Sequence, residues 1–224
     1  MRNFTIVIAK ALFINFLITN PAGVQAQPVA GKMYFSDKPF TTTNEGSKKS
    51  FTSAEYIYGR FELDNASIQE AFRIFEPNEN YPHAYFFYRV YIYFNEQEMG
   101  FNSSVNLCLL RGDSRKNKWF NFDVLPEPAK ATTALCGTNR FNTSLSTTPL
   151  YSLINADNFK QNGEYKIAIK FYYESYDAFN NMEPVEKWPT MEESFSFVFN
   201  AKDVAQIKKN ELASDEVIQK KGLK

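Results

Sequence analysis

The chain has a single histidine, His83, and only two cysteines among its 224 residues. One imidazole cannot supply the several histidine ligands of a typical catalytic zinc site, and it would have to be the general base of any Ser–His or Cys–His pair. His83 follows a proline at the start of a strand-like run, where an exposed imidazole at a loop end is the simpler account. No Gly-x-Ser-x-Gly segment is present either. We therefore expect no catalytic residue, no metal and no cofactor.

One class of enzyme is compatible with these absences, the glycosidases, which need two carboxylates flanking a cleft. Acidic residues lie in or beside strand-like segments at Glu62, Glu96, Asp123 and Glu174. Acids at such positions are usually solvated, and nothing in the sequence brings two of them together. A glycosidase-like enzyme with paired carboxylates is therefore kept only as an alternative.

The chain also lacks an excess of charge of either sign, with 25 basic and 25 acidic residues and a net charge of +0. A nucleic-acid-binding protein needs a basic patch or stripe, so we expect no nucleic-acid partner. Only 9 glycines and 10 prolines exclude a collagen-like or low-complexity chain. Aromatic residues, in contrast, reach 17%, and such side chains bury large areas in cores and contact surfaces. The frequent Phe, Tyr, Asn and Lys favour a bacterial source.

Residues 1–26 have the pattern of a secretory signal peptide, with an early cation, an apolar segment and small residues before Gln27. Lys10 divides the apolar segment, which weakens the pattern. The alternative is a membrane anchor, but each apolar piece is shorter than the roughly 20 residues that a spanning helix needs. The residue directly after the cleavage site is Gln27 and not a cysteine, which excludes a lipid-modified N-terminal cysteine. We expect a secreted, periplasmic or cell-surface protein with no membrane span after cleavage.

Secretion gives the two cysteines a role. Cys108 and Cys136 would enter an oxidising compartment, where a disulfide persists. One bridge between them would close a loop and stabilise the fold by about 3 kcal/mol in the chain-entropy model. Two buried free thiols are the alternative, because the sequence does not give the separation of their Cα atoms.

Residues 83–95 form the longest unbroken run of strand-favouring residues. Side chains alternate across a strand. One face is apolar and predicts a core strand: Phe86, Tyr88, Val90, Ile92 and Phe94. The other face is rich in tyrosine around one cation: Tyr85, Phe87, Arg89, Tyr91, Tyr93 and Asn95. This second face is expected either to lie under a second layer or to meet a partner, and we slightly favour burial.

Further short strand-like segments follow one another with turns between them, at residues 32–36, 56–63, 105–110, 119–125, 165–173 and 195–199. Gly59 inside one of them indicates a bulge or a close backbone approach. Residues 96–102 are expected to turn the chain, residues 149–155 to form a short helix, and residues 65–75 to be either helix or strand. This pattern predicts an all-β fold, an antiparallel β-sandwich of the immunoglobulin-like or jelly-roll kind.

Three regions are expected along the chain: a signal peptide at 1–26, the β-sandwich domain at 27–200, and a helical or partly disordered C-terminal tail at 201–224. In the tail, Asp203 and Ser214 are candidate N-caps of two short helices, at 204–212 and 215–221. Whether this tail docks on the sandwich is left open.

Several short motifs have a simpler interpretation than the functional one. Arg111-Gly112-Asp113 matches an adhesion tripeptide, but it also suits a tight turn between strands. Asn65, Asn102 and Asn142 begin glycosylation acceptor patterns, which matter only in a glycosylating eukaryote. Asp157 and Asn158 stand in a turn without the other ligands of a calcium loop.

The aromatic residues are the better indication of function, because tyrosine and tryptophan are enriched where binding energy concentrates. The candidate binding residues are Tyr85, Tyr91, Tyr93, Tyr172, Tyr176 and Trp188. The alternative is that these tyrosines cover the rim of the core with their hydroxyls in water. The first hypothesis is a non-enzymatic secreted or periplasmic protein that binds another envelope or extracellular component, either a protein or a glycan. A carbohydrate-binding module that uses the Tyr and Trp surface is the second.

Overall fold

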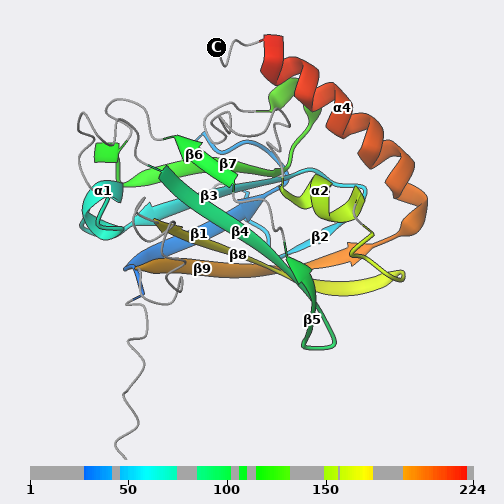
Figure 1. Ribbon diagram of the computed structural model, residues 1–224, viewed down its shortest axis with the longest axis horizontal. Helices are drawn as coiled ribbons and strands as arrows, with labels where there is room; N and C mark the ends of the chain where they lie inside the picture. Colours follow the sequence, from blue (N-terminus) through cyan, green and yellow to red (C-terminus); the bar gives the residue numbers. More distant parts are fainter. Residues whose placement is uncertain are drawn as a thin grey trace, which may run out of the picture.

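The computed structural model describes residues 28–41, 46–74, 85–101, 106–109, 115–131, 149–155, 157–173 and 189–220 (Figure 1). This part of the chain is mostly β, and antiparallel pairing dominates its sheets. The all-β class expected from the sequence is confirmed at this level.

The strands form two sheets. The smaller sheet has the order β1-β3-β7, from β1 (Gly31–Ser36), β3 (Ile57–Leu63) and β7 (Trp119–Leu125). The larger sheet has the order β2-β9-β8-β4-β5. These strands are β2 (Ser50–Thr52), β9 (Thr190–Phe199), β8 (Gly163–Tyr173), β4 (Tyr85–Phe94) and β5 (Gln97–Phe101). A further strand, β6 (Asn106–Leu109), also pairs with β4. β2 runs parallel to β9, and every other described pairing of these strands is antiparallel.

The longest strand-like run of the sequence becomes the central strand β4. β8 pairs along one edge of β4, and β6 and β5 share its other edge. Val90 and Ile92 of β4 lie opposite Ile169 and Ile167 of β8, and all four side chains are completely buried. The prediction that this face of the run belongs to the core is confirmed at Val90 and Ile92, and the side chains of Phe86 and Tyr88 lie outside the described part.

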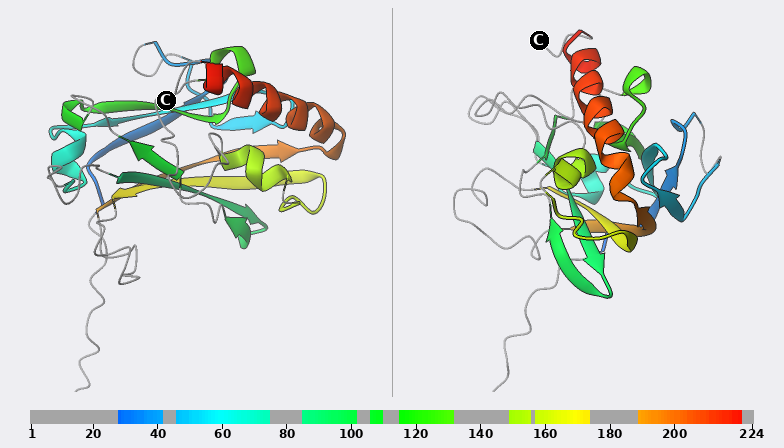
Figure 2. Two further views of the ribbon diagram at one scale, coloured as in Figure 1. Left: turned by 45° about the horizontal axis from the view of Figure 1, so that its top comes forward. Right: turned by 90° about the vertical axis from the view of Figure 1, so that its right-hand side faces the viewer.

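The two sheets lie as layers one above the other (Figure 2). Aromatic rings fill the space between them. The ring of Phe171 on β8 lies 5.1 Å from that of Phe61 and 4.8 Å from that of Phe122. Phe35 on β1 similarly lies 4.7 Å from Phe195 on β9. Tilted and edge-to-face pairs of this kind are the favoured arrangement for aromatic side chains, so the phenylalanine-rich composition goes into the core.

Short helices cover the ends and sides of the core. α1 (Ile68–Ala71) begins with a capping box, in which Ser67 and Glu70 each bond the backbone of the other, and this decides the ambiguous segment in favour of a helix. α2 (Pro149–Asn155) confirms the predicted short helix. It contacts β7 and β4, so it closes one side of the space between the sheets.

The C-terminal tail is one docked helix rather than two. A 3-10 turn, η4 (Ala201–Asp203), leads directly into α4 (Val204–Lys220). The prediction of a second cap at Ser214 is wrong, because this buried hydroxyl donates to the carbonyl of Asn210 at 2.8 Å inside the continuous helix. Ile207 is 3% exposed, and α4 contacts α2 and the 3-10 turn η2 (Pro128–Lys130).

The predicted turn at residues 96–102 is wrong. Only Asn95 and Glu96 turn the chain, with φ of 49° and 65°, and β5 begins at Gln97. Two central residues with positive φ define the type I′ turn that suits the twist of a hairpin. The strand propensity of residues 97–101 is weak, and pairing with β4 overrides it.

Candidate functional site

The structure describes some of the predicted binding residues and not others. Tyr91 and Tyr93 lie on β4, and Tyr172 lies on the neighbouring strand β8. Tyr85 is a strand residue of β4 opposite Leu109, and its side chain is outside the described part. Tyr176 and Trp188 are outside the described residues.

The side of the larger sheet that faces away from the core brings together tyrosines and charged residues. Because Val90, Ile92, Ile167 and Ile169 point into the core, their alternating neighbours on both strands point outward. We call this surface the tyrosine face, and it consists of Arg89, Tyr91 and Tyr93 of β4 with Lys166, Ala168, Lys170 and Tyr172 of β8.

Cations and rings are paired on the tyrosine face. The guanidinium of Arg89 lies over the ring of Tyr172, 5.4 Å from its centroid. The ammonium of Lys166 lies 5.7 Å from the ring centroid of Tyr93, its partner in the ladder. Both separations are within the range of cation–π attraction.

Burial divides the tyrosine face into a closed part and an open part. Tyr172 and Ala168 are 0% exposed, although they point away from the core. Tyr91 and Tyr93 are half-buried, and Lys166 is exposed. Tyr172, one of the candidate binding residues, is therefore enclosed and lies under Arg89. The open part centres on Tyr93.

Burial raises the pKa of both phenols in the open part. Burial raises the pKa of Tyr91, and the carboxylates of Glu192 and Glu98 raise it further, while Arg89 opposes them through a hydrogen bond and its charge. Burial also raises the pKa of Tyr93, together with Glu98 and Glu192. Tyr91 and Tyr93 therefore present neutral hydroxyls between groups of both signs, which suits hydrogen bonding with a partner rather than proton transfer.

A second surface, which the sequence analysis missed, lies on the outer side of the smaller sheet. The ladder aligns outward-facing residues of β1, β3 and β7 in three rows. We call these residues the polar grid: Lys32, Glu62 and Trp119 in the first row, Tyr34, Arg60 and Asn121 in the second, and Ser36, Tyr58 and Asp123 in the third.

The exposure of the side chains falls from the first row of the polar grid to the third. Ser36, Tyr58 and Asp123 in the third row are between 1% and 2% exposed. The backbone N–H of Glu127 donates to the Tyr58 hydroxyl at 2.8 Å, and burial raises the pKa of Tyr58 far above its ordinary value. The first row, in contrast, is open, and Trp119 is 43% exposed.

Arg60 connects the rows of the polar grid. It is only 7% exposed, and its guanidinium bonds Glu62 at 2.6 Å and Asn121 at 3.1 Å. The same group lies 4.4 Å from the centroid of the Trp119 ring. The available signal was the alternation of Tyr58, Arg60 and Glu62 with the apolar residues of β3, which the sequence analysis used only to predict a strand.

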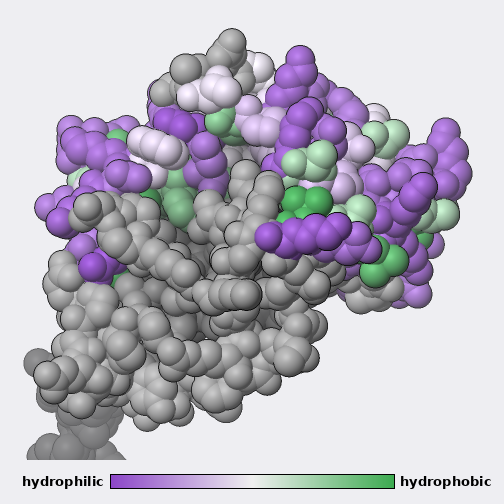
Figure 3. Space-filling view, turned by 90° about the horizontal axis from the view of Figure 1, so that it is seen from above, coloured by the Kyte–Doolittle hydropathy of each residue, from purple (hydrophilic) through white to green (hydrophobic). Residues whose placement is uncertain are grey.

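The side of the molecule shown in Figure 3 is mostly hydrophilic where the structure describes it, and apolar residues form small separate spots. A broad apolar docking surface is therefore not visible on the described part of this side.

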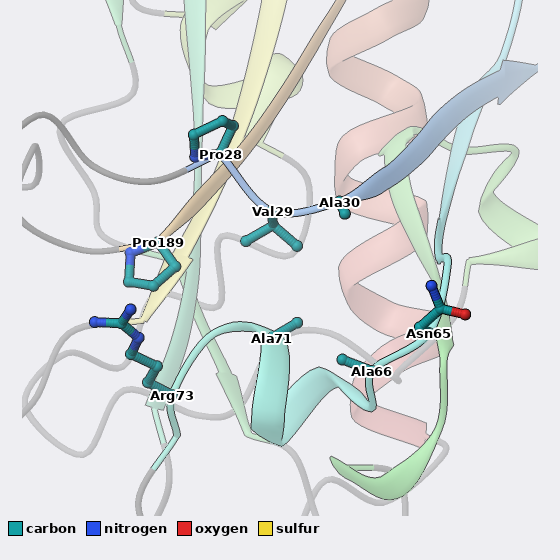
Figure 4. Close-up of a pocket in the computed structure, with 8 residues that line it drawn as sticks. All are labelled: Pro28, Val29, Ala30, Asn65, Ala66, Ala71, Arg73 and Pro189. Atoms are coloured by element: carbon teal, nitrogen blue, oxygen red, sulfur yellow. The ribbon is translucent and has the colours of Figure 1, made fainter.

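A small pocket of about 190 Å³ lies where the described chain begins. Its walls come from the N-terminal segment, from the surroundings of α1 and from the start of β9: Pro28, Val29, Ala30, Asn65, Ala66, Ala71, Arg73 and Pro189 (Figure 4). Ligand sites usually measure roughly 300–1,000 Å³. The pocket is too small for most organic ligands.

Three of the acids considered for a glycosidase are described, and they lie at separate places in the fold, with Glu62 and Asp123 two rows apart on the polar grid. Glu62 pairs with Arg60, Glu96 stands in the exposed hairpin turn, and Asp123 is buried in the third row of the polar grid. Glu174 lies outside the described residues. Within the described ranges, no three His, Cys, Asp or Glu side chains form a group that suits a metal ion.

The cysteine bridge stays a prediction. Cys108 stands in β6 opposite Phe86, its side chain is outside the described part, and Cys136 lies outside the described residues. The signal segment at 1–26, His83 and the Arg111-Gly112-Asp113 turn also lie outside them.

No protein-family model matches the chain, and no curated protein matches it. Of the helices that the structure describes, none combines the length and the apolar character needed to cross a membrane.

Proposed function

We propose that this chain is a secreted or periplasmic, non-enzymatic β-sandwich protein of the immunoglobulin-like kind that binds another envelope or extracellular component through its tyrosine face. The arrangement of the strands supports the immunoglobulin-like topology over the jelly roll. The order β1-β3-β7 corresponds to strands A, B and E, and β9-β8-β4-β5 corresponds to G, F, C and C′.

A local hydrogen bond supports the same topology. Tyr165 stands near the start of β8, which takes the place of strand F, and its hydroxyl donates to the carbonyl of Gln161 at 2.8 Å. This hydrogen bond resembles the tyrosine corner of immunoglobulin-like domains, in which a tyrosine near the start of strand F bonds the backbone a few residues upstream. Antibody domains have a cysteine two residues after this tyrosine. Here that position is Ile167, which is completely buried, so apolar packing replaces the inter-sheet disulfide.

The observation that carries the binding proposal is the open part of the tyrosine face. Tyr93 is half-buried beside Lys166 on two adjacent strands inside the sheet, so a rigid backbone holds the ring. Tyrosine presents a large contact area at a low cost in conformational entropy, and the surrounding charges of both signs supply hydrogen bonds. Secretion rests on the signal pattern of residues 1–26.

Site-specific cross-linking tests this function. A photo-reactive amino acid replaces Tyr93 in one variant and Lys209, which is exposed on α4, in the control. We expect a discrete adduct with one envelope or extracellular component from position 93 only, and we expect Tyr91→Ala to reduce its yield. Equal adduct patterns from both positions would contradict the proposal.

Two mass measurements on the exported protein test the compartment. We expect the mature chain to begin at Gln27 and to be two hydrogen atoms lighter than the reduced chain, because of a Cys108–Cys136 bridge. A chain that retains residues 1–26 would contradict cleavage, and two free thiols would contradict the bridge.

A further inference from the structure

The polar grid is the outer side of the smaller sheet. None of its residues is aliphatic, whereas the opposite side of the same strands carries buried apolar residues such as Met33, Phe61 and Phe120. A polar outer face is common in antiparallel sheets, so it does not by itself indicate a ligand. The feature that does is Trp119, which is 43% exposed among hydrogen-bonding side chains, because tryptophan is enriched where binding energy concentrates.

Trp119 at the open end of the grid is held in place before any ligand arrives. The guanidinium of Arg60 lies 4.4 Å from the ring centroid, so the 43% exposure of Trp119 belongs to the other face and the edge of the indole. Arg60 is itself fixed by Glu62 and Asn121. The amide of Asn121 in turn donates to the backbone carbonyl of Phe40 at 3.2 Å. A rigid ring lowers the entropic cost of binding.

Charge decides between classes of ligand. The grid contains two cations, Lys32 and Arg60, and two acids, Glu62 and Asp123. This balance complements neither an anionic polymer nor a strongly basic one, and the absence of aliphatic residues does not suit an apolar peptide. A neutral oligosaccharide combines the apolar C–H face of a sugar ring with many hydroxyls. The Lys32 ammonium and the half-buried Tyr34 hydroxyl stand in the same grid to bond such hydroxyls.

We propose that the open end of the polar grid binds a neutral oligosaccharide, with one sugar ring stacked on the exposed face of Trp119 and hydroxyls of the neighbouring sugar units bonded by Lys32 and Tyr34, two strands away. This site lies on the opposite sheet from the tyrosine face and does not rest on the function proposed for that face.

Intrinsic fluorescence gives a direct test, because the chain has 2 tryptophans. In a Trp188→Phe background, Trp119 is the only indole. The probes are soluble hexasaccharides of glucose, N-acetylglucosamine, mannose and galactose, at concentrations up to the low-millimolar range. At least one of them is expected to shift and quench the emission of Trp119 in a saturable way. No change with any of the four would overturn the proposal.

Variants separate stacking from other effects, with affinity measured by calorimetry. Trp119→Ala is expected to weaken binding by at least about tenfold, because a stacked tryptophan is a dominant contact, and Trp119→Phe by less. Leu212→Ala, at another exposed apolar residue, is expected to bind as the parent does. Binding that persists in a folded Trp119→Ala variant would overturn the proposal.

Discussion

The ring of Phe122 occupies the space that a side chain at Gly59 would need. A Cβ at Gly59 would lie 2.1 Å from Cζ of Phe122, on the paired strand. The same Phe122 packs against Phe171 of the opposite sheet at 4.8 Å. The absent side chain on β3 therefore lets an aromatic residue of β7 reach across the core.

Gly59→Ala is expected to destabilise the protein by about 1–3 kcal/mol, because overpacking forces side chains and backbone to shift. The double variant Gly59→Ala with Phe122→Leu should lose less stability than the sum of the two single changes, since the smaller side chain leaves room for the methyl group. Urea denaturation of the four proteins measures this coupling. Strictly additive losses of stability would show that the close approach of the Phe122 ring is not what excludes a side chain at Gly59.

Glu96→Gly is expected to stabilise the protein by about 0.5–1 kcal/mol. Glu96 has φ of 65° in a tight hairpin turn, and only glycine adopts this conformation without a steric penalty. Asn95→Gly should have a smaller effect, because asparagine tolerates the left-handed region. A shift of the denaturation midpoint in the two variants provides the comparison, and a loss of stability in Glu96→Gly would contradict the turn assignment.

The proposed tyrosine corner makes a prediction about a single hydroxyl. Tyr165→Phe removes the donor to the Gln161 carbonyl from a side chain that is 1% exposed, and we expect a loss of about 1 kcal/mol. Tyr93→Phe serves as the control, because its hydroxyl lies on the open part of the tyrosine face. If both variants are equally stable, the hydrogen bond of the corner contributes nothing.

Alternation of apolar residues was enough to predict the central strand, its core face and the all-β class. The same rule failed at residues 97–101, where pairing with β4 makes a strand of a segment with weak propensity. The N-cap preference of serine failed at Ser214, whose side chain can cap a helix or bond the preceding turn, and only tertiary packing chooses between these. The polar grid was not predictable because its row order depends on which strands become neighbours, and no local pattern encodes that choice.

Buried phenols predict a loss of stability at alkaline pH. The pKa of Tyr58 is raised by burial first and then by the charges of Asp123 and Glu127, and burial also raises that of Tyr151. In the unfolded chain these phenols ionise near pH 10, so above this pH the native state binds more protons than the unfolded state. The free energy of unfolding is therefore constant below about pH 10 with respect to these groups and falls as the pH rises further.

Denaturation midpoints measured from about pH 8 to about pH 11 test this effect, because this range spans the ordinary pKa of tyrosine. The decline above pH 10 should be shallower in Tyr58→Phe than in the parent, whatever stability the variant loses at neutral pH. Tyr93→Phe should change the slope less. An identical slope in Tyr58→Phe would show that this phenol does not stay protonated in the folded protein.

The docked position of α4 makes the tail part of the domain rather than an appendage. Ile207 is 3% exposed on the helix, whereas Leu212, one and a half turns later, is 68% exposed. Ile207→Ala is expected to lower the free energy of unfolding by about 2–5 kcal/mol, because it removes buried methyl groups and leaves a cavity, while Leu212→Ala should be close to neutral.

Hydrogen exchange distinguishes the two ways in which the Ile207→Ala variant can lose stability. If α4 alone is released, its amides should lose protection in Ile207→Ala while those of β4 and β8 keep theirs. If protection falls in all three elements together, the helix and the sheets unfold as one unit. Equal stability of the Ile207 and Leu212 variants would contradict the docking.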